Sequence, residues 1–133
     1  VQLGTRFVAT EECDASPAFK DAFVQAESKD VRIITSPVGM PGRTITNQFL
    51  NEADDGKRKP DTCRYHCIRS CNPKTTSYCI ANALISAYQG NLTDGFAFTG
   101  TNVGQVKGIS TVSKVFSELN DEYQAALLNQ KKY

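Results

Sequence analysis

The chain contains too few strand-like segments to build a parallel sheet of its own. Residues 1–10 are strand-like, and a helix pattern follows directly, with Ser16 as N-cap and Pro17 at its first position. Residues 31–35 form a second strand candidate, and residues 96–104 predict a brief extended segment that ends in a glycine loop. A parallel strand needs neighbours joined by crossover connections, so the first strand lacks a partner. This pattern predicts one part of a larger α/β fold.

Most of the remaining chain carries apolar residues at helical spacing. The periodicity predicts helices at residues 17–26, 45–53, 62–71, 77–89 and 111–129. A loop at residues 36–42 holds two prolines and two glycines, and Ser77 is the expected N-cap of the fourth helix. On the last helix, the side chains expected to face inward are Val112, Val115, Phe116, Leu119, Tyr123 and Leu127.

Composition narrows the function classes. Apolar residues make up 40% and charged residues 22% of the 133 positions, which is ordinary for a globular protein. No apolar run approaches the roughly 20 residues that a membrane-spanning helix needs. A net charge of +1 gives no general attraction to nucleic acid or to an anionic membrane. The chain shows no start Met and no signal-peptide pattern, so we expect further sequence upstream.

Four of the five cysteines are clustered, with the spacing Cys63-x3-Cys67-x3-Cys71-x7-Cys79. An extracellular disulfide framework normally spreads an even number of cysteines along the chain. The clustering therefore favours a reducing compartment, and we expect the protein to be cytoplasmic. Four thiols in so short a stretch are candidate ligands for zinc or for an iron–sulfur cluster.

Helix geometry weighs against a metal site if this segment is helical. On one straight helix, Cys63 and Cys71 would lie about 12 Å apart along the axis. Tetrahedral zinc needs sulfur atoms only about 4 Å apart, so all four thiols could bind only if the helix breaks near Arg69-Ser70. Cysteine also packs as a small apolar residue. Buried thiols or an incidental disulfide are therefore the simpler interpretation, with zinc or iron–sulfur binding as the alternative.

Other polar residues give weaker indications. Gly4 and Thr5 follow an apolar segment and suit phosphate binding, because glycine admits a ligand close to the backbone and threonine adds a hydroxyl. A strand with a turn glycine is the plain alternative. His66, the single histidine, is interpreted as structural. Arg43 and the basic run at residues 57–59 are interpreted as solvent-facing.

The run VQLGTRFVATEECDASPAFK, residues 1–20, closely resembles the last strand, loop and helix of the nitronate monooxygenase family. These proteins are also called 2-nitropropane dioxygenases, and the family includes FMN-dependent enoyl-[acyl-carrier-protein] reductases. Residues 39–43, with Asn47 and Phe49, resemble the segment that follows that helix in the family. Residues 96–104 resemble its closing glycine loop, so the resemblance extends over nearly the whole chain.

The resemblance implies an FMN-binding TIM barrel. In the family, the Gln-x-Gly-Thr segment lies against FMN and its backbone helps to hold the phosphate. Carried over to the matching positions, Gln2, Leu3, Gly4 and Thr5 would contact FMN. Many relatives have a glutamine where this chain has Thr101, so no contact is assigned at that position.

The same resemblance places the chain at the C-terminal end of the barrel. The implied fold class is α/β, a C-terminal fragment of a TIM (β/α)8-barrel flavoprotein that comprises the last βα unit and a mainly helical extension. Residues 1–35 would form the last barrel strand and helix with a return segment, and residues 36–95 a helical Cys-rich insertion. Residues 96–133 would form the glycine loop and a C-terminal helix that packs on the barrel. His66 does not match the family's upstream catalytic histidine, so no catalytic residue is assigned in this chain.

As an enzyme, the parent protein is expected to oxidise alkyl nitronates with O2 using FMN, and the fragment alone is expected to be inactive. The alternative within the family is enoyl-[acyl-carrier-protein] reduction with NAD(P)H. The alternative of another class is a non-catalytic, Cys-rich module that binds a metal or a partner. The expected partners are a small-molecule substrate and the missing N-terminal barrel segment, with a homodimer left open and nucleic acid and membranes excluded.

Overall fold

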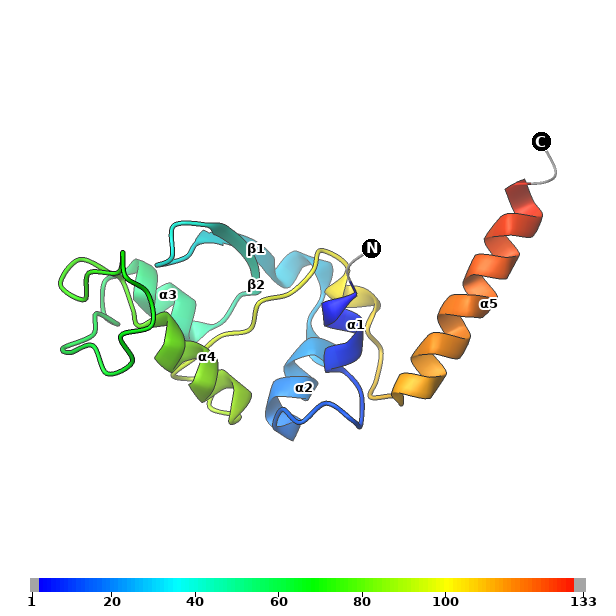
Figure 1. Ribbon diagram of the computed structural model, residues 1–133, viewed down its shortest axis with the longest axis horizontal. Helices are drawn as coiled ribbons and strands as arrows, with labels where there is room; N and C mark the ends of the chain where they lie inside the picture. Colours follow the sequence, from blue (N-terminus) through cyan, green and yellow to red (C-terminus); the bar gives the residue numbers. More distant parts are fainter. Residues whose placement is uncertain (1–2, 131–133) are drawn as a thin grey trace.

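A computed structural model describes residues 3–130, which fold into helices around a single strand pair (Figure 1). The described elements are α1 (Gly4–Val8), α2 (Pro17–Gln25), β1 (Val31–Thr35), β2 (Pro41–Ile45), α3 (Gln48–Asp54), α4 (Ile80–Tyr88) and α5 (Val112–Gln130). Two short 3₁₀ turns, η1 (Ser28–Asp30) and η2 (Val103–Gln105), lie between them. No helix in the described part of the chain is long and apolar enough to cross a membrane.

The expected first strand is helical over most of its described part, residues 3–10. Residues 4–8 form α1, in which the Leu3 carbonyl accepts hydrogen bonds from the N–H groups of Arg6 (3.1 Å) and Phe7 (3.4 Å). Only Thr10 pairs in a strand-like manner, through an isolated parallel bridge to Ser110. A strand needs a row of neighbouring backbone groups, and the described residues offer this segment a single bridge. The strand prediction for residues 1–10 is therefore wrong for the described part of the segment.

The start of α2 follows the local sequence. Ser16 caps the helix by accepting a hydrogen bond from the Phe19 N–H at 3.3 Å, and Pro17 occupies the first helical position. Both features confirm the prediction. Phe23, the fully buried residue of α2, packs with Ala26, Ala97 and Val103 in one of two apolar clusters.

The strands β1 and β2 form an antiparallel hairpin, with Val31 opposite Ile45 and Thr35 opposite Pro41. The turn between them is closed by a hydrogen bond from the Gly39 N–H to the Ser36 carbonyl at 2.9 Å, and Gly39 has a φ of +84°. The helix predicted at residues 45–53 is present as α3, but it begins at Gln48 because Ile45 pairs with Val31 in the hairpin.

The larger apolar cluster joins α3, α4 and the segment before the glycine loop. Phe96 is its centre: its ring lies 6.0 Å from that of Phe49, 5.5 Å from that of Tyr78 and 5.0 Å from that of Phe98. The other buried members are Ile34, Leu50, Ala53 and Ala83. This cluster holds the hairpin, α3 and α4 in one unit (Figure 1).

The segment between α3 and α4 has no helix or strand, although every one of its residues is described. The predicted helix at residues 62–71 is wrong, and His66 shows why, since its φ of +45° lies outside the right-handed helical region. The following helix begins at Ile80 with Cys79 as its N-cap residue, so the expected cap at Ser77 is also wrong.

The last helix, α5, matches its predicted range closely and projects away from the rest of the chain (Figure 1). The Glu12 carboxylate accepts a hydrogen bond from the Val112 N–H, with both oxygens within 3.0 Å of the nitrogen. Val115 is buried, whereas Phe116 and Tyr123 are 61% and 60% exposed. The inward orientation predicted for Tyr123 is therefore wrong, and Phe116 stays mostly exposed although its ring lies 5.5 Å from the Phe7 ring.

The buried hydroxyl of Tyr78 should make stability depend on pH. Burial raises the pKa of Tyr78 to about 12, and its hydroxyl has no hydrogen-bond partner among the described residues. The folded protein therefore holds this proton above pH 10, where the unfolded chain releases it. We expect Tyr78→Phe to change stability little at pH 7. Between pH 10 and 12 the wild type should lose up to about 1.4 kcal/mol per pH unit relative to the variant. Urea unfolding across this range tests the difference, and parallel curves would contradict it.

Candidate functional site

The start of α1 lies against the glycine loop, about a hundred residues later in the sequence (Figure 1). The Thr5 hydroxyl oxygen accepts a hydrogen bond from the Gly100 N–H at 2.7 Å and lies 3.5 Å from the Thr99 hydroxyl oxygen. A Cβ added at Gly100 would lie 3.2 Å from the Thr5 hydroxyl, so glycine permits this close approach. The structure thus brings together two of the segments that the sequence analysis singled out.

Leu3 and Gly4 lie at the exposed N-terminus of α1. Leu3 holds the N-cap position, where its apolar side chain offers no acceptor to the first-turn N–H groups. Gly4 is also exposed, and a Cβ built there would meet no atom within 4 Å. A helix start without a side-chain cap, an open glycine and a threonine hydroxyl suit one part of a phosphate site. Gln2, the fourth expected contact, lies outside the described residues.

Two side chains of α1 fasten this segment to α5. Arg6 forms an ion pair with Glu118, and the Phe7 ring lies 5.5 Å from the Phe116 ring. From α2, the Lys20 ammonium group donates a hydrogen bond of 2.8 Å to the carbonyl of Thr10, which follows α1. None of these contacts was predicted, because each joins residues whose proximity depends on the folded chain.

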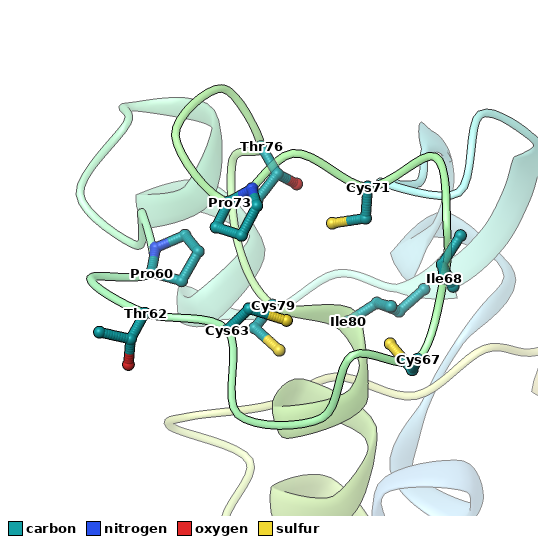
Figure 2. A pocket seen from close by; sticks show the side chains of 10 residues that line it. All are labelled: Pro60, Thr62, Cys63, Cys67, Ile68, Cys71, Pro73, Thr76, Cys79 and Ile80. Carbon is teal, nitrogen blue, oxygen red and sulfur yellow. The ribbon is translucent and has the colours of Figure 1, made fainter.

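The four clustered cysteines line one pocket. Figure 2 shows the loop running around this pocket, with the sulfur atoms of all four cysteines pointing into it. All four are free thiols: Cys67 is exposed, and Cys63, Cys71 and Cys79 are partly exposed. As they stand, no three His, Cys, Asp or Glu side chains of the described residues are arranged to hold a metal ion. The simpler interpretation of the sequence, buried thiols or an incidental disulfide, is therefore wrong, and metal binding by the four thiols stays a prediction.

Arg58 holds in place the start of the cysteine loop, residues 57–79 between α3 and α4. Its guanidinium bonds to Glu52 (2.7 Å), to Asp94 (2.7 Å) and to the Thr93 carbonyl (2.9 Å). It also lies 5.2 Å from the centre of the Phe49 ring, within range of a cation–π interaction. Hydrogen bonds from Arg58 and Asn91 hold the pKa of Asp94 below its usual range. The solvent-facing interpretation of this arginine is wrong, whereas Arg43 is exposed as predicted.

His66 contributes its backbone to the same loop. Its N–H donates a hydrogen bond to the Cys63 sulfur at 3.3 Å, and its side chain is exposed. A sulfur that accepts an N–H bond is better able to carry negative charge.

Comparison with known proteins identifies the wider relationship. A sequence model of the nitronate monooxygenase family matches residues 1–122. The chain belongs to the nitronate monooxygenase family. A probable nitronate monooxygenase from Staphylococcus saprophyticus is 38% identical over 58 residues, which cover 41% of this chain and 16% of that protein.

Solved structures show that the fold of this chain matches part of a larger protein. FabK from Thermotoga maritima superimposes with a TM-score of 0.78 at 24% identity, over 100% of this chain and 39% of that one. A methionine-to-alanine variant of the same protein gives 0.71 at 22% identity, over 36% of its length. This likeness confirms the predicted fold class, a fragment of a TIM-barrel α/β fold. The chain spans about two fifths of the FabK structure.

Proposed function

We propose that the complete gene product containing this chain is an FMN-dependent oxidoreductase that oxidises alkyl nitronates with O2. The observation that carries this proposal is the family match over residues 1–122. The likeness to FabK supports the same fold class. The alternative is enoyl-[acyl-carrier-protein] reduction with NAD(P)H, which the sequence resemblance leaves open. No residue of this chain is assigned a catalytic role.

The proposed contribution of this chain is to hold the phosphate end of FMN. Bound FMN would supply the redox chemistry of the reaction. Leu3, Gly4 and Thr5 would approach the phosphate with the open backbone at the start of α1, and Gln2 joins them by family resemblance. The Thr5 hydroxyl accepts a hydrogen bond from the Gly100 N–H, so its own proton stays available for a phosphate oxygen. The Gly100 contact thus supports this role by orienting the hydroxyl.

Under this proposal, the exposed apolar side chains of α5 would pack against the rest of the barrel. Phe116, Tyr123 and Leu128 are each at least 60% exposed, although they sit on a helix whose first turns are packed. The chain corresponds to 39% of FabK, so the larger fold has further surface available to cover them. The homodimer and the cytoplasmic location stay predictions.

Substituting Gly4 by alanine tests the phosphate contact. The new methyl group meets no described atom within 4 Å, so the fold should be retained. A phosphate that approaches the backbone here would collide with it, and we expect FMN affinity to fall at least about tenfold, equivalent to about 1.4 kcal/mol. Fluorescence titration of FMN into the apoprotein of the complete gene product measures the effect.

Gly108→Ala is the matched control, because its new methyl group also meets no described atom within 4 Å. The control should bind FMN like the wild type. Equal FMN affinity in the two variants would remove the phosphate role from Gly4 while leaving the family assignment intact.

The reaction itself is tested on the flavin-loaded complete gene product. Oxygen consumption that depends on an added alkyl nitronate supports the proposed activity. NAD(P)H consumption that depends on an enoyl thioester, without nitronate turnover, would support the alternative. A purified complete protein that binds no FMN would contradict both.

A further inference from the structure

The loop between α3 and α4 carries a second site, separate from the start of α1. We propose that Cys63, Cys67, Cys71 and Cys79 together bind a thiophilic metal centre, either zinc or an iron–sulfur cluster. Four-thiolate coordination is characteristic of these two kinds of centre. The proposal goes beyond the flavin chemistry, which makes no use of these cysteines.

The exposure of the thiols argues against a packing role. Cysteines that serve as small core residues are buried, as are Tyr78 and Ala83 nearby, which are 4% and 1% exposed. None of the four thiols is buried: Cys67 is exposed, and the other three are partly exposed. The sulfur atoms nevertheless point into one pocket, whose other lining residues include Pro60, Pro73, Ile68 and Ile80 (Figure 2). The thiols thus face one pocket without being packed as core residues, and they would have to move closer together to bind a metal ion.

The irregular backbone removes the obstacle that helix geometry raised. A helix would hold Cys63 and Cys71 about 12 Å apart, whereas this segment turns around the pocket and presents both to its interior. Within it, the Cys71 N–H donates a hydrogen bond to the Ile68 carbonyl at 3.2 Å, which forms a local turn. Long loops without regular structure in compact domains are commonly functional.

The two ends of the loop are fixed, so little chain has to be ordered when the sulfurs converge. Arg58 ties the entrance to Glu52 and Asp94 through its ion pairs. At the exit, Tyr78 is buried in the apolar cluster and Cys79 is the N-cap residue of α4. Closing a loop with anchored ends costs less conformational entropy than gathering ligands from a free chain.

The charge of the loop complements a thiolate centre. Residues 57–79 contain six Lys and Arg residues and one Asp, whereas the whole chain has a net charge of only +1. Zinc bound by four thiolates carries a net charge of −2, and an iron–sulfur cluster bound by four thiolates is anionic as well. Lys57 and Arg58 already pair with carboxylates, so the other four basic residues would supply the compensating charge. The His66 N–H already donates to the Cys63 sulfur at 3.3 Å. Hydrogen bonds of this kind around ligand sulfurs tune metal centres.

Metal analysis of the complete gene product, purified without oxygen and without chelators, tests the proposal. Each ligand cysteine would bind as a thiolate and release its proton to solvent. We expect about one equivalent of zinc, or about four equivalents each of iron and acid-labile sulfide with broad visible absorption. Cys67→Ser and Cys71→Ser should each lower the metal content at least about fivefold. Cys13→Ser is the matched control, because Cys13 does not line the pocket, and it should keep the wild-type content.

Thiol alkylation gives a readout that does not depend on the variants folding. In the metal-loaded wild type, the four pocket thiols should resist maleimide and become reactive after a chelator is added. Less than about a tenth of an equivalent of metal, after both purification and reconstitution with zinc or with iron and sulfide, would overturn the proposal. Equal metal loss in Cys13→Ser would overturn it as well.

Discussion

Replacing Gly95 by alanine is expected to lower the free energy of unfolding by about 3 kcal/mol or more. A Cβ at this position would lie 2.1 Å from the Ala83 carbonyl oxygen, 2.7 Å from the Ala87 nitrogen and 3.0 Å from the Ala87 Cβ. Two of these atoms belong to the backbone of α4, so no side-chain rotation can relieve the overlap. The helix would have to move away from the segment that carries Phe96, at the centre of the larger apolar cluster.

Gly108→Ala again serves as the control for the Gly95 variant. Both substitutions restrict the unfolded chain to the same extent, but the methyl group at position 108 has open space. Urea unfolding of the two variants and the wild type should place Gly108→Ala within about 0.5 kcal/mol of the wild type. A Gly95→Ala variant as stable as this control would show that α4 does not pack on residue 95 as described.

Features set by nearby residues were predictable from the sequence. Ser16 and Pro17 specify the start of α2 through a hydrogen bond and a fixed φ, both within one helical turn. The range of α5 was predicted to within one residue at each end from its apolar spacing alone. The side chains of α5 that face inward were not all predicted correctly, because spacing indicates an apolar stripe but not what covers it.

Features that depend on distant residues were missed. Ile45 follows helical spacing, but Val31 lies opposite it in the hairpin, and strand pairing overrides the local preference. Residues 62–71 place three cysteines at spacings of four, as on one face of a helix, but the left-handed backbone of His66 breaks that helix. The spacing of the cysteines indicates a helical period, but it does not determine the backbone conformation of His66.

The candidate sites divide in the same way. The sequence predicted Gly4 and Thr5 through family resemblance, and the four cysteines through their spacing. The contact between Thr5 and Gly100 and the role of Arg58 required the folded chain, since each links segments at least 35 residues apart. Such partners carry no local signature, so a basic run such as residues 57–59 is easily mistaken for a solvated loop.

Asn47 is the polar residue whose loss should cost the most stability. Its side-chain oxygen caps α3 by accepting a hydrogen bond from the Leu50 N–H at 3.1 Å. Its side-chain nitrogen donates to the Leu92 carbonyl at 3.0 Å and to the Gly95 carbonyl at 2.7 Å. One partly buried amide therefore joins α3 to the segment that precedes Phe96. We expect Asn47→Ala to lower the free energy of unfolding by about 3 kcal/mol, because the cap is lost and two carbonyls lose their donor.

Asn47→Ser separates the two contributions of this amide. Serine can still cap α3, but it cannot bridge both carbonyls, so its loss should be intermediate, at about 1–2 kcal/mol. Gln48→Ala is the control on the same helix, because it removes only an exposed hydrogen bond to Glu52 and should cost less than about 0.5 kcal/mol. Urea unfolding of all three variants gives the ranking. If serine restored the full stability of asparagine, capping alone would explain this residue; if serine were no better than alanine, the bridge to Leu92 and Gly95 would be its main role.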